Sequence, residues 1–167
     1  DDYKNRVIIN WGKSTLAWHQ RLTDKEVIEI LPEGYVKEFP GYHDFILDFK
    51  ELEAIIRNPN ANKKWYSMLS EIFGIYLIID RHTGKFYIGS AYGEEGIWGR
   101  WKNYANNGHG DNVEIKKIID QNNNYKYNFQ FTILRNLSKS LTKKEVIEVE
   151  NLYKMKLCSK EFGLNLN

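Results

Sequence analysis

The side chains best suited to chemistry in this sequence are two tyrosines, one arginine and one glutamate. Tyr76 ends the tripeptide Gly-Ile-Tyr and Tyr87 begins the tripeptide Tyr-Ile-Gly, with ten residues between the two tyrosines. Arg100 follows them, and Glu150 comes fifty residues later. A phenol can hold a proton, a guanidinium matches the oxygens of an anion, and a carboxylate can bind a divalent cation.

Each of these residues also has an ordinary structural interpretation. A tyrosine in a strand normally packs, and a lone carboxylate beside an apolar helix face is more often a salt-bridge partner than a metal ligand. Tyr104 follows Arg100 by four residues, so the two share a face if the segment is helical. Asn165, in the closing run Gly-Leu-Asn-Leu-Asn, by itself indicates only a polar terminus.

The second half of the chain contains the elements that must position these groups. Short runs of β-branched and aromatic residues predict strands, and apolar residues three or four apart predict helices. The predicted strands are 73–79, 85–89 and 127–134, and the predicted helices are 97–106, 113–120 and 143–157. The first two strands form an antiparallel hairpin, which brings Tyr76 and Tyr87 together at one end of the sheet.

The first half of the chain predicts short helices with irregular connections. The helices are expected at 25–31, 49–57 and 61–69, separated by proline, glycine and asparagine. We therefore expect a mainly helical N-terminal extension over residues 1–70, packing on a domain of residues 71–167. The fold class is α+β, similar to an α/β sandwich, with a small three-stranded antiparallel sheet flanked by helices.

Composition excludes several classes of protein. The 167 residues are 42% hydrophobic, enough for a core, and carry a formal net charge of +2. The single cysteine, Cys158, cannot build a disulfide framework or a zinc-finger ligand set. No apolar run reaches membrane-spanning length, so we expect no membrane association and a cytoplasmic location. The chain begins Asp1-Asp2 without a methionine, which favours a piece of a longer protein.

The ordered set of motifs resembles the GIY-YIG endonuclease superfamily. The resemblance covers about residues 71–167 and includes both tripeptides, the arginine with an aromatic residue four positions later, the late glutamate and the near-terminal asparagine. It implies the GIY-YIG nuclease fold, and the stretch from Gly84 to Arg100 is similar to a bacterial branch of the family. In such proteins a nuclease module is typically joined to a domain that selects the target, so an upstream recognition domain is expected.

The resemblance also implies a catalytic set, position by position. It consists of Tyr76, Tyr87, Arg100, Tyr104, Glu150 and Asn165, with Asn167 as an alternative to Asn165 because both follow leucine. Glu150 is the implied ligand of a divalent metal, Mg²⁺ first and Mn²⁺ as a substitute. The implied function is a metal-dependent DNA endonuclease, and the alternative is a non-cleaving DNA-binding or interaction module with the same fold.

Hydrolysis of a phosphodiester needs a positioned water, neutralised phosphate charge and a stabilised leaving oxygen. Arg100 suits the phosphate, and a metal at Glu150 suits the leaving oxygen. We expect Tyr76 to act as the base and Tyr87 to position the water or the phosphate, although the reverse assignment stays open. Since a free tyrosine has a pKa of about 10, a tyrosine base predicts a rate that rises with pH above neutrality.

Residues outside this set are candidates for DNA contact. Lys102, Lys116 and Lys117 are interpreted as phosphate contacts or as ordinary surface with equal weight, and His109 lies in a flexible loop. The sequence contains no helix-turn-helix, zinc or ribbon motif that would read bases. Target sequence and oligomeric state therefore stay open.

Overall fold

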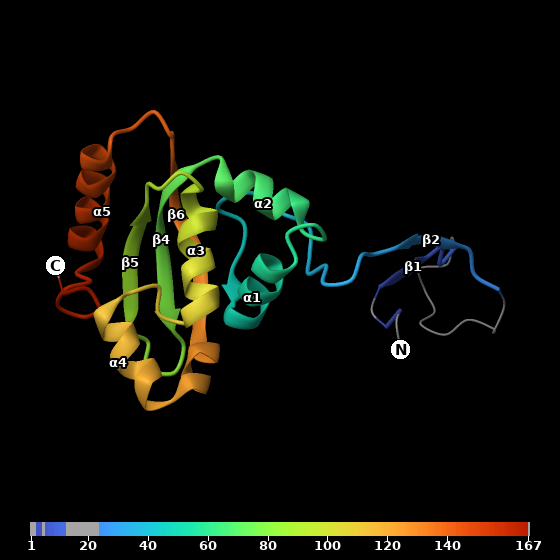
Figure 1. Ribbon diagram of the computed structural model, residues 1–167, viewed down its shortest axis with the longest axis horizontal. Helices are drawn as coiled ribbons and strands as arrows, with labels where there is room; N and C mark the ends of the chain where they lie inside the picture. The colour runs from blue at the N-terminus through green and yellow to red at the C-terminus, as the bar shows by residue number, and fades with distance from the viewer. Residues whose placement is uncertain (1–2, 5, 13–23, 167) are drawn as a thin grey trace.

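The computed structural model describes residues 3–4, 6–12 and 24–166 of the chain. Its main body is a four-stranded antiparallel sheet in the order β3-β6-β4-β5 (Figure 1). The strands are β3 (Leu47–Asp48), β4 (Phe73–Asp80), β5 (Phe86–Ala91) and β6 (Phe129–Leu137). The helices are α1 (Phe49–Arg57), α2 (Lys63–Ser70), α3 (Gly96–Asn107), α4 (Val113–Gln121), the 3₁₀ helix η1 (Asn123–Asn128) and α5 (Lys143–Leu157).

Helices cover the two faces of this sheet unequally. The larger core lies on the face that carries Tyr76 and Ile78, where α1, α2 and α3 pack around Trp65 and Trp101. The smaller core lies on the opposite face, where α5 brings Val146 against Ile75 and Ile88. The α+β prediction is confirmed, and the sheet gains the two-residue strand β3 beside the three predicted strands.

The turn between β4 and β5 is organised by one buried carboxylate. Asp80 is 1% exposed, and its oxygens accept hydrogen bonds from the His82 amide, the Thr83 hydroxyl and the Tyr125 hydroxyl. These bonds close the hairpin and tie it to η1. The register that follows pairs Tyr76 with Gly89 and Ile78 with Tyr87.

Residues 39–69 belong to the main core. Phe45, Leu52, Trp65 and Leu69 are buried in the cluster that also contains Trp101, and the indole of Trp65 donates a hydrogen bond to the Lys37 carbonyl. The helices predicted at 49–57 and 61–69 are confirmed as α1 and α2. The division at residue 70 stays a prediction.

The helix predicted at 25–31 was wrong. Val27–Ile30 forms the strand β2, which pairs antiparallel with β1 (Val7–Ile9) in a separate two-stranded sheet. Three of the four residues in β2 are the β-branched Val27, Ile28 and Ile30, whose side chains favour an extended backbone. Figure 1 draws this hairpin apart from the main body, and all four residues of β2 are exposed. Among the described residues, no helix is long and apolar enough to cross a membrane.

Candidate active site

Three of the predicted site residues form one hydrogen-bonded cluster. Tyr76 points from β4 toward α3, and its hydroxyl accepts a bond of 2.9 Å from Nε of Arg100. The hydroxyls of Tyr76 and Tyr104 lie 3.3 Å apart, and a second nitrogen of Arg100 donates to Tyr104 at 3.5 Å. The guanidinium also lies over the Tyr104 ring, 5.2 Å from its centroid. The four-residue spacing of Arg100 and Tyr104 therefore places both on the face of α3 that meets Tyr76.

Burial decides the protonation of the two inner phenols. Tyr76 and Tyr104 are both 0% exposed. Burial raises the pKa of Tyr76, and Tyr87 adds to that increase while Arg100 opposes it. Burial likewise raises the pKa of Tyr104 well above its ordinary value. Both hydroxyls are therefore neutral near pH 7, and they hold the guanidinium as hydrogen-bonding groups.

Tyr87 has a different environment from the other two tyrosines. It is a diagonal neighbour of Tyr76 on the same sheet face, with ring centroids 6.4 Å apart. The pair lies in the middle of the two strands and not at one end of the sheet as predicted, because the ladder continues to Gly74 and Ala91. Tyr87 is partly exposed and lines two adjoining cavities.

Glu150 reaches the site from the opposite face of the sheet. It lies on α5, where one carboxylate oxygen is 2.7 Å from the ammonium of Lys154 and the other accepts a hydrogen bond from the hydroxyl of Ser90. Sequence reasoning missed Lys154 as a site residue. The spacing of four between Glu150 and Lys154 on a predicted helix was the signal that could have found the ion pair.

The two sets of residues meet at the free edge of β5. Because β5 is the last strand of the sheet, groups on its two faces can converge around its edge. The cleft there has a volume of about 940 Å³ and is lined by Tyr87, Arg100, Glu150 and Lys154, among others. A smaller cavity of about 190 Å³ adjoins it and shares Tyr87, Arg100 and Lys154.

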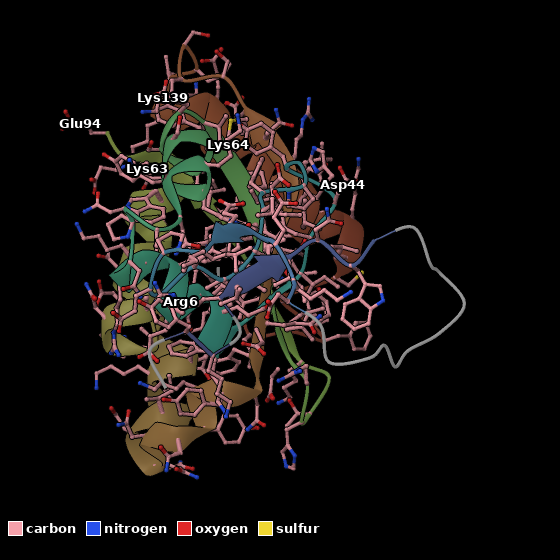
Figure 2. All side chains as sticks on the ribbon, turned by 90° about the vertical axis from the view of Figure 1, so that its right-hand side faces the viewer. Arg6, Asp44, Lys63, Lys64, Glu94 and Lys139 are labelled. Carbon is pink, nitrogen blue, oxygen red and sulfur yellow. The ribbon has the colours of Figure 1, made fainter. Side chains whose placement is uncertain are left out.

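A loop forms the rim of the larger cleft. Tyr92, Gly93, Glu94 and Glu95 connect β5 to α3 and line the cleft. The ammonium of Lys139, from the connection between β6 and α5, donates a 2.5 Å bond to the Glu94 carbonyl; both residues are labelled in Figure 2. This bond connects the rim to the segment that leads into the helix of Glu150.

Glu150 is the candidate metal ligand in this cleft. Among the described residues, no three His, Cys, Asp or Glu side chains gather in a way that could hold an ion. Mg²⁺, however, usually keeps several waters and binds through one or two carboxylates together with substrate phosphates. Glu150 lines an open cleft of ample volume, so its environment fits a hydrated cation of this kind, provided that its present partners give way.

Asn165 holds the strand that carries Tyr87. Its side-chain oxygen accepts a 2.9 Å bond from the Ile88 amide, and its side-chain nitrogen donates a 2.8 Å bond to the Ile88 carbonyl. The Leu164 amide also donates to the Phe86 carbonyl at 2.7 Å. The C-terminal segment thus hydrogen-bonds the outer backbone groups of β5 at Phe86 and Ile88. The edge of β5 beside Ser90 borders the cleft. Asn167, the alternative, lies outside the described residues.

The four predicted DNA-contact residues lie outside the linings of the two cavities. Lys116 pairs with Asp120 and Lys117 pairs with Glu114, each at 2.6 Å on α4. Lys102 is exposed on α3, 3.9 Å from Glu95. A ring nitrogen of His109 accepts a 3.0 Å bond from the Asp111 amide. None of these four residues lines either cavity.

Comparisons with known proteins give a limited result. No protein-family model and no curated protein matches the chain. Two solved structures, both of the catalytic domain of the intron homing endonuclease I-TevI and one of them a mutant, are similar to 57% of this chain. The matched region covers 94% of the mutant domain, at 27% identity and a TM-score of 0.43. It covers 98% of the other domain, at 28% identity and a TM-score of 0.42. Both TM-scores lie below 0.5, which is a weak overall superposition.

Proposed function

We propose that this chain contains a divalent-metal-dependent DNA endonuclease domain that hydrolyses phosphodiester bonds. The observation that supports it best is the convergence of Tyr87, Arg100 and Glu150 in one cleft at the edge of β5. These residues come from three different elements and from both faces of the sheet. They are also three of the positions on which the resemblance to the GIY-YIG superfamily depends.

Arg100 binds the scissile phosphate in this proposal. Its guanidinium stays protonated and offers a planar pair of donors to two phosphate oxygens. The guanidinium is already fixed by its hydrogen bonds to the buried hydroxyls of Tyr76 and Tyr104, so the Arg100 side chain loses little freedom when the phosphate binds. The charge that develops on the phosphate in the transition state is then stabilised by a group that needs no reorganisation.

Tyr87 is the phenol that meets the attacking water. Tyr76, which we expected to be the base, is fully buried beneath Arg100, whereas Tyr87 lines the cleft. A water in the cleft can donate a hydrogen bond to the Tyr87 oxygen, which places that oxygen to take up the water's proton as the attack proceeds.

Glu150 is the residue that would hold the divalent cation. When bound, such an ion supplies positive charge that stabilises the transition state and the departing oxygen. Mg²⁺ is the expected ion and Mn²⁺ a substitute, since oxygen ligands and water suit both. DNA is the expected substrate through the family resemblance.

Incubation with supercoiled plasmid and Mg²⁺ or Mn²⁺ tests the proposal. Wild type should nick the plasmid, and Arg100→Ala and Glu150→Gln should reduce the rate by at least about a hundredfold. Arg57→Ala and Glu148→Gln are matched controls, since both residues lie outside the cleft and their side chains are more than 60% exposed. A wild type that binds DNA but leaves it intact with every metal and pH tried would instead establish the non-cleaving module.

A further inference from the structure

Lys154 is a buried cation in the proposed site. It is 8% exposed, although lysine is almost never buried unless it is paired. Its ammonium lies 2.7 Å from a carboxylate oxygen of Glu150, one turn earlier on α5. Lys154 also lines both cavities, together with Tyr87 and Arg100. The same ammonium therefore borders the metal-ligand candidate and the space proposed for phosphate.

The ion pair occupies the position that a metal would need. One oxygen of Glu150 is paired with Lys154, and the other accepts from Ser90. A divalent cation on this carboxylate would lie within a few ångströms of the ammonium, and two positive charges so close repel strongly when the side chains that hold them are only 14% and 10% exposed. The cation and Lys154 therefore compete for Glu150.

The Lys154 side chain has space to move when a cation displaces its ammonium from Glu150. Its side chain is a compact charge on a flexible four-carbon stem, and both cavities open beside it. A phosphodiester held there by Arg100 carries oxygens that accept a charge-assisted hydrogen bond. Movement of the ammonium from carboxylate to phosphate keeps it paired throughout, which avoids the cost of an unpaired buried charge.

On this basis, and resting on the nuclease function proposed above, we propose that Lys154 is a counter-charge switch. Its ammonium pairs with the Glu150 carboxylate in the free protein. When a divalent cation binds that carboxylate, the Lys154 side chain moves and its ammonium pairs with a DNA phosphate oxygen instead. Metal and DNA then favour each other's binding, since each removes the obstacle to the other. In the absence of DNA the switch keeps metal affinity low, which limits unproductive loading of the site.

Calorimetric titration of the DNA-free protein with MnCl₂ tests the switch without any need for cleavage. Lys154→Met removes the charge but keeps the length of the side chain, so it should bind Mn²⁺ roughly tenfold more tightly than wild type. Lys154→Arg keeps a cation and should stay within about threefold of wild type. Lys156→Met removes an exposed cation from the same helix and should leave the affinity unchanged.

The double variant Lys154→Met with Glu150→Gln shows whether the gain acts through the carboxylate, because it should lose the tighter binding. Circular dichroism melting of every variant establishes that it is folded. With Mn²⁺ saturating, Lys154→Met should nick plasmid at least about tenfold more slowly, whereas Lys156→Met should match wild type.

Equal Mn²⁺ affinities of wild type and Lys154→Met would overturn the switch and leave the nuclease proposal intact. A gain in affinity that persists in the double variant would overturn it as well. If Glu150→Gln did not weaken Mn²⁺ binding in any background, Glu150 would not be the metal ligand, and this result would contradict both proposals. The plasmid assay tests the nuclease proposal separately.

Discussion

Burial divides the three tyrosines of the site into two kinds. Tyr76 and Tyr104 are 0% exposed and meet Arg100 through their hydroxyls, whereas Tyr87 is partly exposed at the cleft. A buried phenol resists ionisation, so the inner pair act on the guanidinium as neutral partners. Only Tyr87 combines the right chemistry with access to a water in the cleft.

The raised pKa values of Tyr76 and Tyr104 predict a loss of stability at high pH. Above the ordinary tyrosine pKa of 10.0, the unfolded chain releases protons that the folded chain still holds. The free energy of unfolding is therefore unaffected by these groups below about pH 10 and falls as pH rises further, by up to about 1.4 kcal/mol per pH unit for each such group.

Urea unfolding between about pH 8 and 11 measures this slope. Tyr76→Phe should make it shallower, because one of the groups responsible is gone. Tyr66→Phe, at a tyrosine that is 43% exposed, is the control for loss of a hydroxyl outside the site. Identical slopes in wild type and Tyr76→Phe would contradict the buried, neutral state of Tyr76.

Asn165 predicts a coupled loss of stability and activity. Asn165→Ala leaves the amide and the carbonyl of the fully buried Ile88 without their partners. An unsatisfied buried group costs about 1–3 kcal/mol, so the free energy of unfolding should fall by about 2 kcal/mol. Nicking should slow too, since Ile88 adjoins Tyr87. Lys160→Ala, at an exposed site on the same segment, is the control, and an unchanged stability of Asn165→Ala would refute this role.

At the scale of elements, the free edge of β5 brings the site together. Tyr87 and Arg100 approach this edge from the larger core, and Ser90 and Glu150 approach it from the face covered by α5. The C-terminal segment covers the edge at Phe86 and Ile88, and the edge at Ser90 borders the cleft. An edge strand that is half covered and half used as a site is also protected from pairing with other chains.

Strand pairing at this edge requires a glycine opposite Tyr76. A Cβ at Gly89 would lie 2.3 Å from the Tyr76 hydroxyl oxygen, so Gly89→Ala must displace the ring and weaken its bond with Arg100. Such overpacking costs about 1–3 kcal/mol, and nicking should fall with stability. Gly93→Ala is the matched control in the same cleft, because its Cβ meets nothing within 4 Å; its unfolding free energy should change by less than about 0.5 kcal/mol. Equal effects of the two substitutions in urea unfolding would contradict the proposed fit.

At the scale of the whole molecule, the hydrophobic core extends well upstream of the Gly-Ile-Tyr and Tyr-Ile-Gly motifs. Phe45, Leu52 and Trp65 share one cluster with Tyr76 and Trp101, and β3 adds a strand beside β6. The hairpin of β1 and β2 contributes no residue to this cluster. We therefore infer that the proposed nuclease domain begins near Pro32.

Two truncations test this boundary. A chain that starts at Pro32 should melt cooperatively and nick plasmid as wild type does. A chain that starts at Glu71 should fail to fold, because it loses Leu52, Trp65 and Leu69, all buried on the main core. Circular dichroism melting measures both, and a cooperative transition in the shorter chain would place the boundary at residue 70 after all.

The sequence by itself determined the local elements of the main body and the motifs that carry the proposed catalytic residues. The helices at 49–57 and 143–157 have the predicted bounds, because apolar periodicity reports which face a helix must bury. The antiparallel hairpin brought Tyr76 and Tyr87 together for the same local reason. The error at 25–31 arose because the β-branched residues there favour an extended backbone, in a segment that, among the described residues, packs on no core to fix its periodicity.

Only the tertiary structure decided how these elements share a site. Periodicity says which face of a strand is buried but not which strand lies at the edge of the sheet, and the cleft depends on β5 being that strand. Likewise, the burial of Tyr76 and the pairing of Glu150 with Lys154 and Ser90 depend on packing between segments far apart in the chain. Ionisation and competition for a cation follow from such surroundings, which no local pattern of residues contains.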